Sequence, residues 1–283
     1  MNEGVIMSIS IKLAHSPDAD DAFMFYGLAM GKISTEDIQY EHVLKDIQTL
    51  NEWALTGKME ITAISAHAYA YVHDKYSILI HGGSIGKNYG PIVVSKKAIS
   101  LDDFKDKLIA VPGKMTSAYL ALRLCIKQFS EKIVPFDQIL ETVAAGEADA
   151  GLLIHEGQLT YLQQGFKKII DLGEWWFNMT RLPLPMGLNA IRKDLPQPLQ
   201  KKISTHLKNS IQYSLDHRQE ALDYALKFGR GLSRPIADQF VGMWVNERTL
   251  DMGEEGKKSI IEFLKQASTH ALIPEFPAVD FVN

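Results

Sequence analysis

Residues 108–129 read LIAVPGKMTSAYLALRLCIKQF, and this stretch decides the fold. Its first four residues form a short apolar run that is typical of a buried strand. A turn of small and polar residues follows, and apolar residues then recur at helical spacing over 117–129. A strand, a turn and an amphipathic helix in this order form the repeating unit of α/β proteins.

The same unit recurs through the first two thirds of the chain. We expect strands at 8–14, 38–44, 59–64, 78–81, 92–95, 108–111 and 150–154. We expect helices at 20–30, 47–56, 66–72, 117–129, 136–145 and 156–164. Alternation of this kind predicts mainly parallel sheets with helices on both faces.

The last third of the chain is helix-rich, over residues 195–228, 235–246 and 254–269. One apolar stripe in this part of the chain follows helical spacing and consists of Ile236, Phe240, Met243 and Trp244. We interpret this stripe as core packing rather than as part of a cofactor site.

The chain length predicts two lobes, because 283 residues exceed the usual size of one domain. Two segments are candidates for crossings between lobes: 91–95, which follows a glycine-rich loop, and 183–189, which is rich in proline. If both are crossings, residues 94–188 form an inserted lobe, and residues 1–93 plus 189–283 form a discontinuous one. A small ligand would then bind in the cleft between the lobes.

Composition and charge exclude several classes of function. The net charge is −4 without a basic run, which argues against a nucleic-acid partner. The nine histidines and the single Cys125 show no metal-ligand spacing, so we expect no metal. No apolar stretch is long enough to span a membrane. The first residues lack the pattern of a secretory signal, so we expect a cytoplasmic protein.

Residues 15–21, HSPDADD, follow the first expected strand. In open α/β sheets ligands bind at this edge, which makes Asp18 and Asp20 candidates for the cleft. Either of them could instead cap the following helix, and we favour capping for at least one. The three acids of this segment, Asp18, Asp20 and Asp21, would together repel an anion, so they cannot pair with the negative charge of a ligand.

Two further strand-to-helix turns offer polar groups to a ligand. The first ends in Ser65, which equally suits a helix cap. The second is Thr116-Ser117-Ala118, where free backbone amides and two hydroxyls at a helix start favour an anion. We regard this second turn as the best candidate for binding a carboxylate, with an ordinary helix cap as the alternative.

His155 stands at the end of an expected buried strand, directly before a helix. The positive end of that helix should favour neutral imidazole, which is a competent general base near pH 7. A structural role for a single histidine is the alternative. Trp175 and Trp176 suit either the wall of a pocket or the core of a lobe.

Six segments taken together resemble the 1,4-dihydroxy-6-naphthoate synthases of the futalosine route of menaquinone biosynthesis. They span Ser16 to Gly187 in matching order and read SPDADDAFMFYGLA, ITAISAHAYAY, YGPIVVSKK, GKMTSAYLALRL, GLLIHEGQLTY and LGEWWFNMTRLPLPMG. The resemblance implies a type 2 periplasmic-binding-protein-like fold, with the ligand cleft between its lobes. It also implies a cofactor-independent lyase that converts cyclic dehypoxanthine futalosine into 1,4-dihydroxy-6-naphthoate.

The same resemblance assigns roles to residues. It implies that His155 is the general base, and that the substrate contacts are Ala63, Ile64, Ser65, Thr116, Ser117 and Ala118. The chain departs from the family pattern at residues 18–21, where many members read CPND, and at Arg181. Two alternatives share the fold: a chorismate dehydratase of the same route, and a non-catalytic binding protein for a small organic anion.

Overall fold

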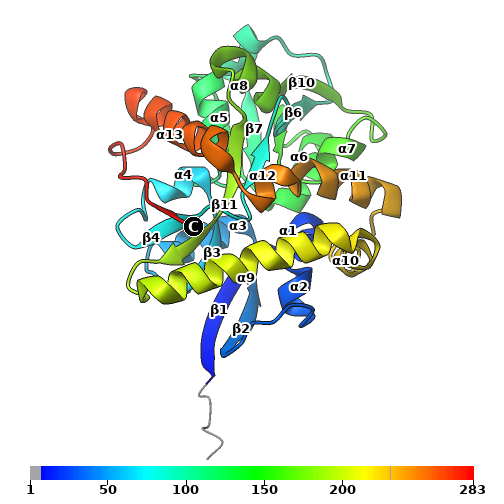
Figure 1. The fold of residues 1–283 in the computed structure, drawn as a ribbon. Coiled ribbons are helices and arrows are strands. Elements are labelled where there is room, and N and C mark those ends of the chain that lie inside the picture. The colour runs from blue at the N-terminus through cyan, green and yellow to red at the C-terminus, as the bar shows by residue number, and fades with distance from the viewer. Residues whose placement is uncertain (1–7, 230) are drawn as a thin grey trace, which may run out of the picture.

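The computed structural model describes residues 8–229 and 231–283, which fold into a mixed α/β structure with two sheets. Figure 1 shows one sheet in the lower half of the view, with β1, β2 and β3, and the other in the upper half, with β6, β7 and β10. The long helix α9 crosses the lower half. The fold class expected from the sequence is therefore correct.

The larger sheet takes its strands from both ends of the chain. Its order is β12 (Phe281–Val282), β4 (Tyr76–Leu79), β11 (Leu184–Arg192), β3 (Ile61–Ser65), β1 (Ile9–His15) and β2 (Ile38–Leu44), with β5 (Ser84–Gly86) also paired to β11. The smaller sheet has the order β10 (Lys167–Asp171), β6 (Ile92–Ser95), β9 (Ala150–Leu153), β7 (Leu108–Val111) and β8 (Ser130–Ile133). Every described strand of the smaller sheet lies between residues 92 and 171.

Helices connect and cover the strands. Those of the first two thirds are α1 (Ala19–Met24), α2 (Tyr26–Ala29), α3 (Ile47–Ala54), α4 (Ala66–Tyr69), α5 (Ser117–Cys125), α6 (Ile139–Ala144), α7 (Gly157–Thr160) and α8 (Leu172–Thr180). The last third adds α9 (Gln197–Asp216), α10 (Arg218–Ala225), α11 (Arg234–Trp244), α12 (Glu247–Leu250) and α13 (Gly253–Thr269). Short 3₁₀ turns lie at Leu101–Asp106 and Phe136–Gln138.

The expectation of mainly parallel sheets is wrong. Strand β11 runs antiparallel to β3, β4 and β5, and β6 runs antiparallel to β9 and β10. These two strands contain the segments that the sequence marked as crossings. They oppose their neighbours because they carry the chain between the two sheets, whereas the neighbouring parallel strands belong to strand–helix units.

Two large cores hold the molecule together. One joins residues of both sheets, such as Ile64 and Val93, to Phe263 of α13 and Trp176 of α8. The other packs α1, α2, α9, α10 and α11 against the larger sheet. Within the described residues, no helix combines the length and the apolar character needed to cross a membrane.

Candidate functional site

A pocket lies where the carboxyl ends of strands from both sheets meet. Ser16 follows β1, Ser65 ends β3, Thr116 follows β7 and Ile154 follows β9. The complete lining consists of Ser16, Asp18, Asp20, Asp21, Ile47, Ala63, Ser65, Gly82, Ser84, Thr116, Ser117, Ala118, Ile154, Met186, Gly187, Leu188, Asn189 and Trp244. Parallel strands in one sheet end at the same edge, which is why segments distant in sequence converge here.

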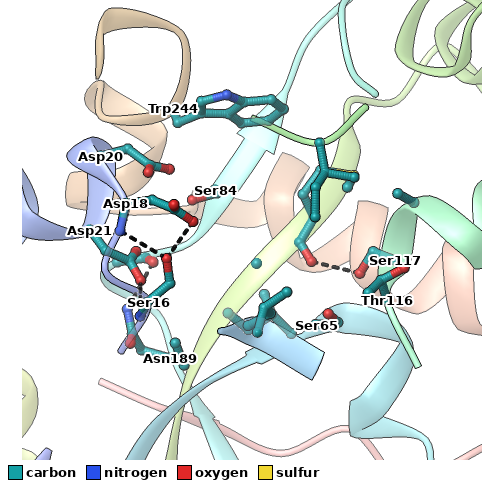
Figure 2. A pocket seen from close by; sticks show the side chains of 18 residues that line it. Ser16, Asp18, Asp20, Asp21, Ser65, Ser84, Thr116, Ser117, Asn189 and Trp244 are labelled. Atoms are coloured by element: carbon teal, nitrogen blue, oxygen red, sulfur yellow. Dashed lines mark hydrogen bonds between the residues drawn. The ribbon is translucent and has the colours of Figure 1, made fainter. Parts of the chain in front are cut away.

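Carboxyl groups form one side of the pocket (Figure 2). The backbone amide of Ser16 donates to Asp21 Oδ2 at 2.7 Å, and the Ser16 hydroxyl donates to Asp18 Oδ2 at 2.5 Å. Asp18 occupies the N-cap position of α1, but its side chain makes no capping bond. Asp20 lies inside the helix. The capping interpretation is therefore wrong for both residues, because Ser16 draws the Asp18 carboxylate back toward the strand end.

Burial changes the protonation of these acids. Burial raises the pKa of Asp21 to about 7. The hydrogen bond from the Ser16 amide lowers this pKa, and the charge of Asp18 raises it. Burial, followed by the charges of Asp21 and Asp18, holds the pKa of Asp20 well above its usual range. Near neutral pH this side of the pocket therefore carries less negative charge than three acids would suggest, and a protonated carboxyl can donate as well as accept.

The start of α5 forms the opposite side. The Thr116 hydroxyl accepts from the amide of Tyr119 at 3.2 Å, so the cap that the sequence suggested is confirmed. The amides of Ser117 and Ala118 precede the first bond of the helix and lie at its positive end. The pocket therefore has a donor-rich side facing an acidic side.

Ser65 lies on the floor between these two sides. It stands at the N-cap of α4 without making a side-chain capping bond. The side chain of Asn51 instead donates to the Ser65 hydroxyl at 3.0 Å and accepts from the Ser65 amide at 2.8 Å. Ala63 also lines the pocket, whereas the side chain of Ile64 points into the core and is not among the lining residues.

Gly113, in the turn before α5, is a glycine because a side chain there would collide with Gln48. Its φ is +156°, and a Cβ there would lie 2.2 Å from Gln48 Oε1. The side chain of Gln48 accepts from the amide of Met115 at 3.2 Å. The glycine thus leaves room for Gln48, and it does not line the pocket.

The structure does not bring His155 into the lining of this pocket. Its neighbour Ile154 lines it, while the His155 ring is 8% exposed and packs edge-on against Phe136 with centroids 4.5 Å apart. His155 lines an adjacent hollow together with Lys96 and Asp137. The general-base assignment thus requires a change at the start of α7 before the ring can meet a ligand.

His15 is unsuited to proton transfer. Burial, followed by the nearby His42, lowers its pKa to about 3, although a bond to the Ser16 carbonyl raises it. Its Nδ1 lies 3.0 Å from that carbonyl and its Nε2 lies 3.1 Å from His42 Nδ1. His15 therefore stays neutral, and it packs behind the acidic side rather than lining the pocket.

The structure decides between core and pocket for Trp176 and gives Trp244 a place in both. Trp176 is buried, and its Nε1 donates to the Pro183 carbonyl at 3.0 Å, so it packs the core. Trp244, which we placed in a core stripe, is 3% exposed and also covers the pocket (Figure 2). Arg181 is exposed at the end of α8 with φ 63° and is not a lining residue.

Sequence reasoning missed several lining residues, among them Ser84, Asn189 and Trp244. The sequence did not identify Asn189 because it lies in β11, a central strand that one proline precedes and another enters, and whose first part was interpreted as a crossing. Among the described residues, no group of three or more potential metal ligands is placed to hold a metal ion.

Comparison with known proteins gives one consistent family. A family model described as menaquinone biosynthesis matches residues 11–269. A protein from Thermus thermophilus named 1,4-dihydroxy-6-naphthoate synthase is 38% identical, covering 96% of this chain and 99% of the relative. A protein of the same name from Streptomyces coelicolor is 31% identical, covering 94% and 95%.

Solved structures agree on the fold. A crystal structure of an Archaeoglobus fulgidus protein superposes with a TM-score of 0.90 at 46% identity, covering 93% of this chain and 98% of that one. An alkanesulfonate-binding protein from Xanthomonas axonopodis pv. citri, bound to MOPS, superposes with a TM-score of 0.72 at 11% identity, covering 95% and 96%. This second likeness places the chain in the periplasmic-binding-protein fold.

Proposed function

The chain belongs to the menaquinone-biosynthesis family, and on that basis we propose that it is a 1,4-dihydroxy-6-naphthoate synthase. The reaction would be a cofactor-independent lyase reaction that converts cyclic dehypoxanthine futalosine into 1,4-dihydroxy-6-naphthoate. One observation supports this most strongly: the residues that the resemblance assigns to substrate binding converge on a single pocket, with Ile64 as the exception.

The start of α5 would hold the substrate carboxylate. The amides of Ser117 and Ala118 lie at the positive end of a nine-residue helix, and the Thr116 hydroxyl fixes that end by capping it. Helix starts of this kind bind anions through their free amides. The lining residues of the acidic side include no cationic side chain that could pair with a carboxylate, so the distribution of donors favours a single orientation of the substrate.

His155 would act as the general base. Three observations support this role: the residue belongs to the LIHEG segment that resembles the family, it follows the buried strand β9, and Ile154 beside it lines the pocket. Residues 154–157 connect β9 to the four-residue helix α7, so a local rotation there would move the ring toward the substrate. Such a change on ligand binding is common in enzymes that close around their substrate.

In the proposed reaction His155 removes a hydroxyl proton from the bound substrate, a C–C bond breaks, and the remainder of the substrate leaves as a carbonyl compound. The electron pair of the broken bond passes into the ring system, which takes up a proton, and formation of the aromatic product makes the reaction favourable. The pocket contributes by positioning the substrate and excluding water, since Ala63, Ala118 and Trp244 surround it with apolar surface.

A direct assay tests this proposal. The purified protein is incubated with cyclic dehypoxanthine futalosine, and in parallel with chorismate, and the products are identified by mass spectrometry. The proposal expects 1,4-dihydroxy-6-naphthoate from the first substrate and unchanged chorismate in the second reaction. Conversion of chorismate alone would assign the chain to the dehydratase instead.

A further inference from the structure

The two sides of the pocket differ so strongly that they must recognise different chemical groups. The α5 side offers amide donors at a positive helix end. The opposite side places Asp20 so that its carboxyl points into the space beneath Trp244 (Figure 2). A second anionic group is disfavoured there, whereas a hydroxyl group can donate to a carboxylate or accept from a carboxylic acid.

Asn189 supplies an independent indication of a ligand on this side. The side chain is 2% exposed and belongs to the pocket lining. Its Nδ2 donates to the Gly82 carbonyl at 2.9 Å, with Met24 Sδ at 3.6 Å. Among the residues that the structure describes, none donates a hydrogen bond to Asn189 Oδ1.

The orientation of this amide is fixed by its surroundings. The Gly82 carbonyl requires the nitrogen, so the oxygen cannot take that place without losing the bond. Gly82 has a φ of +81°, and a Cβ there would lie 2.2 Å from Asn189 Nδ2, so the glycine is what allows the two groups to meet. An acceptor held in place without a donor is costly when buried, and a ligand donor would relieve that cost.

We propose that Asp20 and Asn189 form a hydroxyl-binding subsite, which holds the hydroxylated end of a ligand whose carboxylate lies at the start of α5. This assignment rests on the proposed function and goes further, because it names the group that each side recognises. Asp20 and Asn189 are then specificity-determining residues. Burial raises the pKa of Asp20, which fits this role, because a carboxyl that takes up a proton more readily can donate as well as accept.

Two naphthoates test the subsite. The first is 1,4-dihydroxy-6-naphthoate, and the second is 2-naphthoate, which has the same rings and carboxylate without the hydroxyl groups. Titration calorimetry under anaerobic conditions, which protect the hydroquinone, gives the ratio of their Kd values for each protein variant. The wild-type protein is expected to bind the dihydroxy compound about tenfold more tightly, since two hydrogen bonds to its hydroxyls contribute roughly a factor of 3 each.

The Asp20→Ala variant should lower this ratio to about threefold or less, while its affinity for 2-naphthoate stays within a factor of about two of the wild type. Alanine suits the first turn of α1, so this variant should fold. Asn189→Leu should act in the same direction, but it also leaves the Gly82 carbonyl without its donor. If Asn189→Leu fails to fold, Asp20→Ala alone decides the test.

The matched control is Asp103→Ala, which replaces an exposed aspartate outside the pocket. This variant should leave both affinities unchanged.

An unchanged ratio in folded Asp20→Ala would overturn the subsite while leaving the proposed function intact. Equal loss of both ligands would also overturn it, because that result indicates a general effect on the pocket. Failure of the wild-type protein to bind either naphthoate would instead contradict the proposed function, and the subsite with it.

Discussion

The hydroxyl of Ser117 donates a hydrogen bond of 2.6 Å to the backbone carbonyl of Met186. Ser117 is the first residue of α5, which follows a strand of the smaller sheet, and Met186 lies in β11 of the larger sheet. Both residues line the pocket. This bond therefore connects α5, the helix that follows β7 of the smaller sheet, to β11 of the larger sheet at the point where we place the substrate carboxylate.

Ser117→Asp should abolish binding of the carboxylate. The substitution places a negative charge at the helix end that we propose holds the ligand anion, and it removes the donor to Met186. We expect the affinity for 1,4-dihydroxy-6-naphthoate to fall by at least about a hundredfold, as expected for a like charge in a partly desolvated site. Calorimetry measures the change, and unchanged affinity would exclude this site.

Ser117→Ala is the matched control for that variant. It removes the bond that the hydroxyl donates to Met186 and the one that it accepts from the His67 amide, but it adds no charge and keeps the backbone amides. We expect a loss of about 1 kcal/mol in the free energy of unfolding, with ligand affinity reduced by less than about tenfold. If Ser117→Ala were as damaging to binding as Ser117→Asp, the hydroxyl rather than the amides would hold the ligand.

The stability of the protein should fall in acid partly because of His67. Burial lowers the pKa of His67 to about 4, although its bond to the Thr116 carbonyl raises it. Between about pH 6.5 and pH 4 the unfolded chain gains a proton at this residue and the folded chain does not, so the free energy of unfolding falls as the pH falls. The contribution at full protonation of the unfolded chain is up to roughly 3 kcal/mol.

His67→Gln isolates this contribution. The difference in unfolding free energy between the wild type and the variant, measured by denaturant titration at several pH values, should shift in favour of the variant as the pH falls through this range. A comparison is needed because other groups titrate nearby: His15 acts in the same direction as His67. Asp21, with its pKa raised to about 7, acts oppositely and costs stability as the pH rises from about 4 to 7. A difference independent of pH would show that His67 is not buried as described.

Trp176→Phe should reduce stability without changing catalysis. Trp176 is fully buried, packs edge-on against Phe263 and donates to the Pro183 carbonyl, which also accepts from the Ser259 hydroxyl. We expect a loss of about 1–3 kcal/mol in the free energy of unfolding, from lost packing and a lost hydrogen bond. The values of kcat and KM should stay near those of the wild type. A changed KM at unchanged stability would return Trp176 to the pocket.

Ligand binding should bring the two proposed lobes, residues 94–188 and residues 1–93 plus 189–283, closer together. Two crossing segments allow a hinge, and closure would exclude water from the reaction. Small-angle scattering should show a smaller radius of gyration with saturating 1,4-dihydroxy-6-naphthoate than without it. Equal radii, with binding confirmed in the same sample, would indicate a cleft that is closed before the ligand arrives.

Local pattern was sufficient to predict much of this fold. The strands at 38–44, 92–95 and 108–111 occur with the expected bounds, because each is a short apolar or alternating run between turn residues. Strand β11 was missed because two prolines precede and enter it, and a single sequence gives no sign that Pro185 lies at a register shift. Its antiparallel direction follows from long-range pairing, which local pattern does not contain.

The pocket was predictable where it is built from strand-to-helix turns. Asp18, Ser65 and Thr116 follow strands, and the general rule for ligand sites in α/β sheets identifies them. Sequence pattern did not identify Asn189 and Trp244, which line the pocket, or Asn51, which bonds to Ser65. Tertiary packing brings each of them there from the middle of a helix or strand or from a helix end. The orientation of the His155 ring is likewise set by its contact with Phe136 and not by its place in the sequence.

We propose that His155 is the general base, and kcat together with Tm of the His155→Asn variant distinguishes this role from a structural one. Asparagine keeps approximate size and hydrogen bonding but lacks basicity. With the wild-type protein as reference, kcat for cyclic dehypoxanthine futalosine and Tm are measured on the same preparation. We expect kcat to fall by about 10²–10⁴-fold, as is typical for removal of a positioned general base, with Tm and product affinity little changed. Near-normal kcat together with a lowered Tm would instead show that His155 is structural.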